Sequence, residues 1–264
     1  MDLPLFPLNA VLCPGIALPL HVFEDRYRAL VRHCLETTSP FGVVLIREGR
    51  EVGAGAISFS GVGTIAEIRD AGRQDDGKFD LLVVGTRRFG IRRVLEGQAP
   101  YLVADVGILD ETVGDPALAQ QLAMSATRRF VTYLELLQPR SGETSEDIDV
   151  RVEVETEADD DDADAEEEPE VDEDGESLAA DDDADPPPRR RRRVLIPDDP
   201  TVLSHLLAGI LQIELPRRQA LLELGTTEER LLALLGLIDR EILLLRRRLR
   251  AYIPDARVVG PRRS

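Results

Sequence analysis

The sequence has 264 residues and a mass of 29.2 kDa, a length that permits one large domain or two small ones. Hydrophobic residues make up 43% of it, enough for a buried core, and the formal net charge is −18 at pH 7. The charge is unevenly placed, because residues 143–185 hold 24 acidic side chains and one arginine, whereas residues 189–193 are all arginine. Elsewhere acidic and basic residues are equal in number, so the composition indicates a neutral globular protein with one very acidic insert.

Several enzyme classes are excluded by the scarcity of lysine, since Lys78 is the only one in the chain. A Walker A phosphate loop needs Gly-Lys followed by Ser or Thr, but Lys78 precedes Phe79. A Ser–Lys protease dyad would need the same lysine, next to a predicted turn. The sequence also lacks a Gly-x-Ser-x-Gly elbow, and its three histidines form no local signature. We therefore expect a protein that is not an enzyme, with a hydrolase of unrecognised type as an alternative.

The chain is expected to be soluble and cytoplasmic. Its first residues show no basic region followed by a clean apolar stretch, so no secretory signal is predicted. The longest apolar run, residues 231–245, is interrupted by charges at residues 239–241. Two cysteines do not make a disulfide framework.

Residues 1–110 are predicted to form a β-rich lobe with one helix. Strand-type runs lie at residues 2–8, 16–20, 41–46, 53–59, 62–68, 78–86, 89–95 and 101–108. Their spacing of about ten residues favours a small twisted barrel or sandwich. Prolines in the first two runs cannot donate to a ladder, so we expect edge or bulged strands there. The helix is predicted from one apolar stripe, which consists of Tyr27, Leu30, Val31, Cys34 and Leu35.

Residues 111–139 and 194–254 are predicted to form a helical lobe. Two of its helices should begin at an Asp-Pro pair, where the aspartate caps the helix and the proline takes the first helical position. Thr226 and Glu229 make a capping box for the last helix, whose leucines and isoleucines repeat about every 3.5 residues. Such a seam serves either packing within the chain or a homodimer, so both a monomer and a homodimer stay open.

Residues 140–193 interrupt the helical lobe and are predicted to be disordered, as is the tail at residues 255–264. The insert has few large apolar residues and a long acidic tract, so it cannot offset its own ordering entropy. It ends in five arginines that could bind anions, namely Arg189, Arg190, Arg191, Arg192 and Arg193. The nearby acids compete for these arginines, which favours an acid–base clasp or plain solvation over binding of a polyanion.

The opening run from Leu3 to Tyr27 resembles the start of the Lon protease N-terminal, substrate-binding domain. The runs at residues 41–46, 61–67 and 85–91 match the family's later strands in order, and parts of the last two helices are similar to its bundle. The resemblance covers about residues 2–138 and 194–252. It implies an α+β fold in which a PUA-like pseudobarrel precedes an α-helical bundle.

The family recognises damaged, unfolded or tagged polypeptides for an attached ATPase and protease. Neither attachment is visible in this sequence, so it resembles a stand-alone member. The resemblance therefore implies a non-catalytic polypeptide-recognition or adaptor protein in cytosolic protein quality control, with unfolded or tagged polypeptides as partners and a protease or chaperone acting with it. RNA binding through the PUA-like lobe and the arginine run is the alternative function.

The candidate polypeptide contacts are apolar residues of the opening run, although each could equally lie in the core. They are Phe6, Leu8, Leu18, Leu20 and Phe23. Glu24, Arg26 and Tyr27 at the helix entry are either a recognition surface or, as we favour, a helix start with Tyr27 packed inward.

No cofactor or metal is expected. The run from Gly61 to Ala66 fits a weak dinucleotide-loop pattern, but a strand follows it where a phosphate site needs a helix. Cys13, His21, His33 and Cys34 lack the paired spacing of a zinc site.

Overall fold

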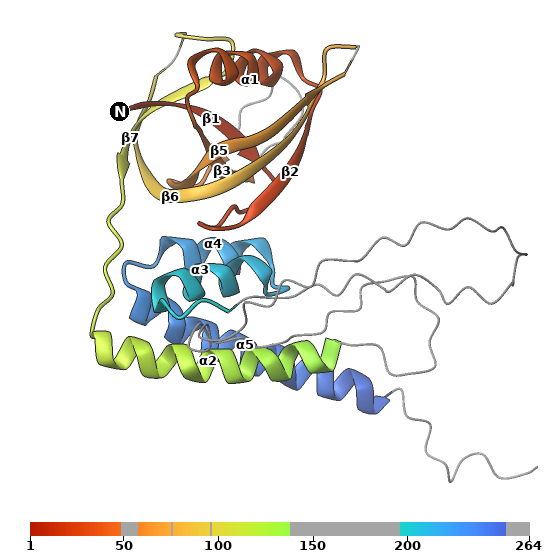
Figure 1. Cartoon of the computed structure of the whole chain (residues 1–264), viewed down its shortest axis with the longest axis vertical. Helices are drawn as coiled ribbons and strands as arrows, with labels where there is room; N and C mark the ends of the chain where they lie inside the picture. The colour runs from red at the N-terminus through yellow and green to blue at the C-terminus, as the bar shows by residue number, and fades with distance from the viewer. Residues whose placement is uncertain (49–57, 75, 96, 138–195, 252–264) are drawn as a thin grey trace, which may run out of the picture. The chain divides into compact units, whose positions relative to one another are not determined.

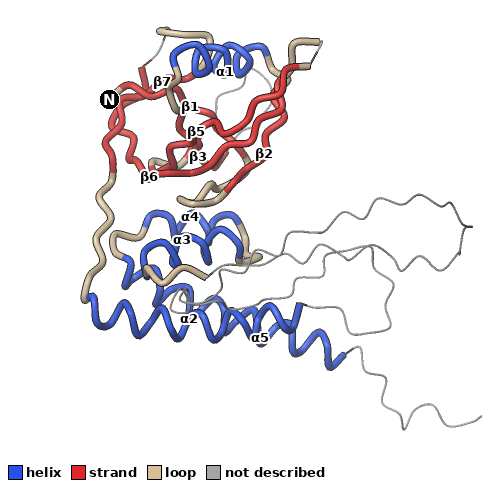
Figure 2. Tube along the Cα trace, in the orientation of Figure 1, coloured by secondary structure: helices blue, strands red, loops and turns tan. Residues whose placement is uncertain are grey.

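The computed structural model describes residues 1–48, 58–74, 76–95, 97–137 and 196–251 (Figure 1). The described residues of 1–137 and 199–251 form one compact unit. Its β-rich part consists of β1 (Asp2–Leu8), β2 (Ala17–Val22), α1 (Asp25–Thr37), β3 (Phe41–Glu48), β4 (Ser58–Phe59), β5 (Val62–Arg73), β6 (Phe79–Leu95) and β7 (Leu102–Ile108). Its helical part consists of α2 (Pro116–Leu137), α3 (Pro200–Ile210), α4 (Leu215–Glu223) and α5 (Thr227–Ala251). The predicted order, strands with one helix followed by a helical bundle, is confirmed (Figure 2).

The strands close into a ring because β1 pairs on both of its sides. It lies antiparallel to β7 through residues 2–5 and parallel to β3 through residues 5–8. The path β1-β7-β6-β5-β3 is thereby joined end to end, while β2 pairs with β6 and β4 with β3 outside the ring.

The prediction that the first run is an edge or bulged strand is wrong, and staggered pairing is the reason. Met1 and Val106 form two backbone hydrogen bonds with each other. Successive residues of a strand point their backbone N–H and C=O groups to alternate sides, so the nitrogen of Pro4 points away from β7 and that of Pro7 points toward it. Among the described residues, β3 pairs with β1 only from Leu5 onward, and β7 pairs with β1 only up to Leu5. Each proline nitrogen therefore faces a side of β1 without a partner strand at that point, and no ladder bond is lost.

The second run is an edge strand, as predicted. Within the described part of the chain β2 pairs with β6 alone, and Gly85 donates its N–H to the carbonyl of Ile16 at 3.0 Å. Counting alternate residues from Ile16, the nitrogen of Pro19 points to the open side of β2, so the proline removes no hydrogen bond between β2 and β6.

Two predicted strands, at residues 78–86 and 89–95, are a single strand, β6. The expected break is instead a register shift, where Thr64 pairs with Arg88 and Ala66 pairs with Gly85. A bulge of this kind bends a strand and increases its twist without ending it.

Helix α1 packs one side into the core of the β-rich part. Tyr27, Leu30, Val31 and Cys34 are buried in the larger of two apolar clusters there. The fifth member of the predicted stripe, Leu35, is 41% exposed. The prediction is wrong for Leu35, because this residue lines a surface groove beside the core.

The helical part begins with the caps that the sequence predicted. Asp115 and Asp199 each accept hydrogen bonds from the N–H groups of the second and third residues of α2 and α3. Thr226 and Glu229 bind each other's backbone N–H groups through their side chains, at 3.2 and 3.1 Å. Four residues of the α5 seam, Leu231, Leu235, Ile238 and Ile242, are buried where this helix packs along α2 and α3, so this part of the seam serves packing within the chain.

The predicted insert at residues 140–193, with its arginine run, and the predicted tail at residues 255–264 lie outside the described residues. Most of the predicted strand at residues 53–59 lies outside them as well, and its last two residues form β4.

Candidate functional site

The five apolar residues predicted to contact a polypeptide do not form one exposed surface. Phe6 and Leu8 are core residues, and the ring of Phe6 stacks on that of Tyr27 with centroids 4.2 Å apart. Leu18 and Leu20 are half-buried and pack against the same core. Phe23, which is 47% exposed, is the member that a partner can reach most readily. The prediction is thus corrected for Phe6 and Leu8, since both are buried in the apolar cluster that includes the inner side of α1.

The three residues at the entry of α1 contact one another. Arg26 donates a hydrogen bond from Nε to Glu24 at 3.1 Å, and its guanidinium lies 4.5 Å from the centre of the Tyr27 ring. Tyr27 is buried, as the favoured interpretation expected. These contacts account for the three residues as a helix start.

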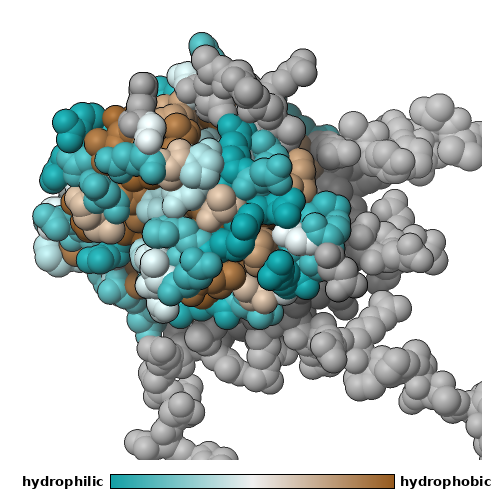
Figure 3. Space-filling view, turned by 90° about the horizontal axis from the view of Figure 1, so that it is seen from above, coloured by the Kyte–Doolittle hydropathy of each residue, from teal (hydrophilic) through white to brown (hydrophobic). Residues whose placement is uncertain are grey.

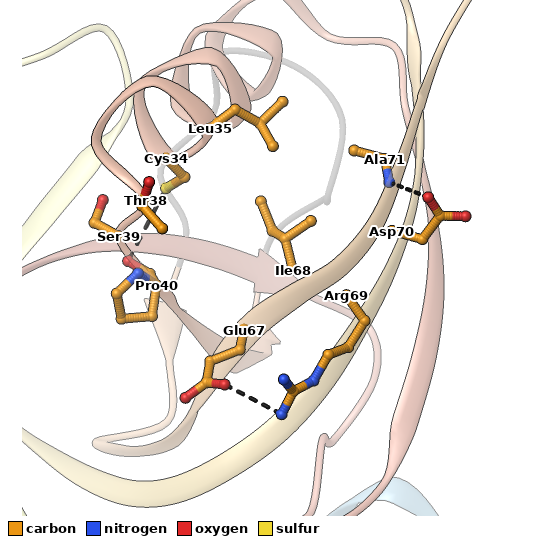
Figure 4. Close-up of a pocket in the computed structure, with 10 residues that line it drawn as sticks. All are labelled: Cys34, Leu35, Thr38, Ser39, Pro40, Glu67, Ile68, Arg69, Asp70 and Ala71. Carbon is orange, nitrogen blue, oxygen red and sulfur yellow. Dashed lines mark hydrogen bonds and ion pairs between the residues drawn. The ribbon is translucent and has the colours of Figure 1, made fainter.

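The groove beside Leu35 is a candidate binding site that the sequence did not reveal (Figure 4). It lies between the C-terminal end of α1 and strand β5 and has a volume of about 440 Å³. Its walls are Cys34, Leu35, Thr38, Ser39 and Pro40 from α1 and the turn after it, and Glu67, Ile68, Arg69, Asp70 and Ala71 from β5. The side chains of Leu35 and Ile68 approach each other from the two walls (Figure 4). On the face shown in Figure 3, apolar patches are interspersed among polar residues.

One wall of the groove is a strand edge with an unpaired side. β3 pairs with β5 only at residues 64–66, whereas β5 continues beside β6 as far as Arg73. Within the described ranges, the side of β5 opposite β6 therefore has no partner strand from Glu67 onward. On this stretch Ala71 donates its backbone N–H to the side chain of Asp70 at 2.9 Å (Figure 4).

The electrostatics of the groove are negative. Glu67 pairs with Arg69 at 3.2 Å, which leaves the carboxylate of Asp70 as the excess charge among the lining residues. Helix α1 has no basic residue in its last turn, and its last carbonyls accept hydrogen bonds from Thr37, Thr38 and Ser39. The groove therefore suits a ligand that combines apolar and positively charged groups.

The other wall holds a strained residue and an unreactive thiol. Thr38 ends α1 in the left-handed conformation, with φ 51° and ψ 37°, which is unfavourable for a β-branched residue. Burial raises the pKa of Cys34 to about 11, although a hydrogen bond from Ser39 opposes the rise. The thiol therefore stays protonated near neutral pH and is a poor nucleophile.

A buried polar cluster joins the strands to the helices. Arg88, on β6, donates to both carboxylate oxygens of Glu111, at 2.6 and 3.1 Å, and to the carbonyls of Leu222 and Leu224 at 2.8 and 2.6 Å. Arg230, on α5, lies 3.5 Å from the same carboxylate. Sequence reasoning missed this cluster because its members are distant in the chain and each, taken alone, resembles an ordinary surface charge.

One carboxylate serves two arginines in this cluster, so one positive charge remains in excess. Burial raises the pKa of Glu111, but hydrogen bonds and charges from His205 and Arg88 outweigh it and hold the pKa at about 2. Burial and the nearby Arg88 lower the pKa of Arg230 to about 10. His205 lies 3.3 Å from Glu111, and burial lowers its pKa, so its imidazole is neutral at pH 7. The arrangement is that of a structural clasp between elements.

The remaining motifs have structural roles or no ligand geometry. The run from Gly61 to Ala66 leads into and occupies β5, as the strand interpretation predicted. Across the residues that the structure describes, no cluster of three histidine, cysteine or acidic side chains is placed to hold a metal ion. In the same ranges no helix combines the length and apolar character needed to cross a membrane.

Comparison with known families assigns the chain. The model of the ATP-dependent protease La (LON) substrate-binding domain matches residues 2–240, which include both the β-rich part and most of the helical part. The chain therefore belongs to the Lon substrate-binding domain family.

Curated relatives in this family are much longer than the chain. Lon protease of Anaeromyxobacter dehalogenans and Lon protease 2 of Myxococcus xanthus are each 28% identical to it over 149 residues, which cover 56% of the chain and 18% of the relative. The chain thus corresponds to less than a fifth of either protein.

Solved structures show the same fold over nearly the whole chain. A Lon N-terminal domain protein from Xanthomonas campestris is 24% identical, has a TM-score of 0.50 and covers 96% of this chain and 99% of its own. The N-terminal domain of the Mycobacterium avium complex Lon protease is 17% identical, has a TM-score of 0.51 and covers 90% and 98%.

Proposed function

We propose that this protein is a non-catalytic recognition module that binds unfolded or tagged polypeptides and presents them in a Lon protease context, as part of protein quality control. The observation that carries the proposal is the match of the Lon substrate-binding domain across residues 2–240. The relatives place this domain in proteins named as proteases, of which the chain covers 18%. The activity assigned to the chain is therefore binding alone.

The groove between α1 and β5 supports the proposal. Its volume of about 440 Å³ lies within the usual range of ligand sites, and its walls combine apolar side chains with a few charged ones. The only cysteine in its lining is a protonated thiol, which suits binding better than nucleophilic catalysis. RNA binding stays a prediction, because the arginine run on which it rests lies outside the described residues.

The proposal is tested by titrating the purified chain into fluorescein-labelled lysozyme that has been reduced, alkylated and thereby unfolded. Folded lysozyme with the same label is the matched control, because it has nearly the same composition and charge. Saturable binding of the unfolded form alone is the expected result. Equal binding of both forms, or of neither, would overturn client recognition, and a steep loss of binding with salt would indicate simple charge attraction.

A further inference from the structure

We infer that the groove between α1 and β5 binds an extended, basic segment of a polypeptide as an added strand on the unpaired edge of β5. The inference rests on the proposed function and makes it specific, because it names the place, the backbone geometry and the charge of the bound segment. Three features of the groove carry it: a strand edge, an adjacent helix and a negative charge.

The strand edge supplies the backbone partner. From Glu67 to Arg73, β5 is held on one side by β6 and, among the described residues, lacks a strand on the other. An unpaired edge offers a row of N–H and C=O groups with the spacing that an extended chain requires. The N–H of Ala71 bonds to Asp70 Oδ1 at 2.9 Å rather than to a neighbouring strand, and an added strand would replace that bond.

The helix limits what fits beside that edge. The C-terminal part of α1 forms the opposite wall, so a bound segment lies between a helix and a strand and is kept extended. In an extended segment every second side chain points the same way. Leu35 and Ile68 then provide an apolar surface for one set of side chains, while the alternate set faces the charged rim.

The charge at the rim selects basic side chains. Arg69 is already paired with Glu67 at 3.2 Å, so Asp70 gives the lining of the groove an excess of one negative charge. A lysine or arginine next to apolar residues complements this arrangement, whereas an acidic residue is repelled. An alternating pattern of basic and β-branched residues is thus the preferred ligand.

The test uses an end-blocked, fluorescein-labelled peptide of eight alternating lysine and valine residues. A peptide of alternating glutamate and valine tests the charge, and a lysine–valine peptide with methylated backbone nitrogens at every second residue tests strand addition. We expect the lysine–valine peptide to bind about tenfold more tightly than either alternative.

Variants of the chain locate the site. Leu35→Glu is expected to weaken binding of the lysine–valine peptide about tenfold. Leu244→Glu on α5 is the matched control, because Leu35 and Leu244 are 41% and 43% exposed, and it should leave binding unchanged. The double change Glu67→Gln with Asp70→Asn leaves Arg69 as the charge of the lining and should shift the preference toward the glutamate–valine peptide. Circular dichroism establishes that each variant is folded.

The outcomes separate the inference from the proposed function. If unfolded lysozyme binds but Leu35→Glu and the double variant, both folded, bind the peptides as the unchanged chain does, the groove assignment is wrong while client recognition stands. Equal affinity for the methylated peptide would overturn strand addition. If neither unfolded lysozyme nor any peptide binds, both proposals fail.

Discussion

Arg88 and Glu111 form a two-pronged ion pair, with N···O distances of 2.6 and 3.1 Å, in which the arginine is fully buried. The same guanidinium binds carbonyl groups at the end of α4, so this one pair connects β6, the segment after β7 and the helical part. The strands and helices of the compact unit are therefore joined by charge as well as by apolar packing.

Glu111→Gln is expected to lower the free energy of unfolding by about 3–5 kcal/mol, because it leaves Arg88 and Arg230 buried without a compensating charge. Urea denaturation followed by circular dichroism measures the change. Asp239→Asn is the matched control, since Asp239 pairs with Arg129 at 3.2 Å on the surface and its loss should have little effect. If Glu111→Gln and Asp239→Asn lowered the free energy of unfolding equally, the structural role of the buried cluster would be contradicted.

Lowering the pH should reduce the free energy of unfolding through protonation of Glu111, within a defined pH range. Its pKa falls from 4.5 to about 2 on folding, so its stabilising contribution is complete above pH 4.5 and is lost as the pH falls toward 2. The loss should be on the order of 3 kcal/mol. The measurement is the difference in unfolding free energy between the unchanged chain and Glu111→Gln from pH 6 to pH 2.5. A difference that stays constant over this range would argue against the lowered pKa.

Replacement by alanine should affect stability at only one of two glycines in the same motif. A Cβ on Gly63 would collide with the carbonyl oxygen of Val43 and lie 2.7 Å from the Phe89 ring, whereas a Cβ on Gly61 would meet nothing within 4 Å. Gly63→Ala is expected to cost about 1–3 kcal/mol of stability and Gly61→Ala close to nothing. Thermal unfolding of both variants checks this, and a dinucleotide loop would instead make both glycines matter for binding.

Thr38→Gly should stabilise the chain by about 1 kcal/mol, because glycine adopts the left-handed conformation at φ 51° without the steric penalty of a β-branched residue. Thr37→Gly is the control, since Thr37 is the last helical residue of α1 and glycine there should destabilise by a similar amount. Chemical denaturation of the two variants gives both values. A loss of stability in Thr38→Gly would show that the threonine side chain makes a compensating contact.

The sequence predicted correctly the features that depend on residues close together in the chain, such as helix caps. The Asp115 and Asp199 caps and the capping box at Thr226 each depend on residues within one turn of a helix. Such contacts form wherever the segment is helical, so they can be read without knowledge of the fold.

The errors arose where pairing between distant segments decides the outcome. Two prolines made β1 resemble an edge strand, but the stagger between β7 and β3 that accommodates them is a property of the closed ring. Leu35 matched the apolar stripe, yet β5 ends up beside it at a distance that leaves a groove. Arg88, Glu111 and Arg230 meet only because four elements converge, so no local spacing could have indicated the clasp.

The position of Pro19 has a consequence for the open edge of β2. Its nitrogen lies on the open side of β2, the side on which this strand has no neighbour among the described residues. Pro19 thus removes one N–H group from this edge, which disfavours pairing of β2 with a further strand.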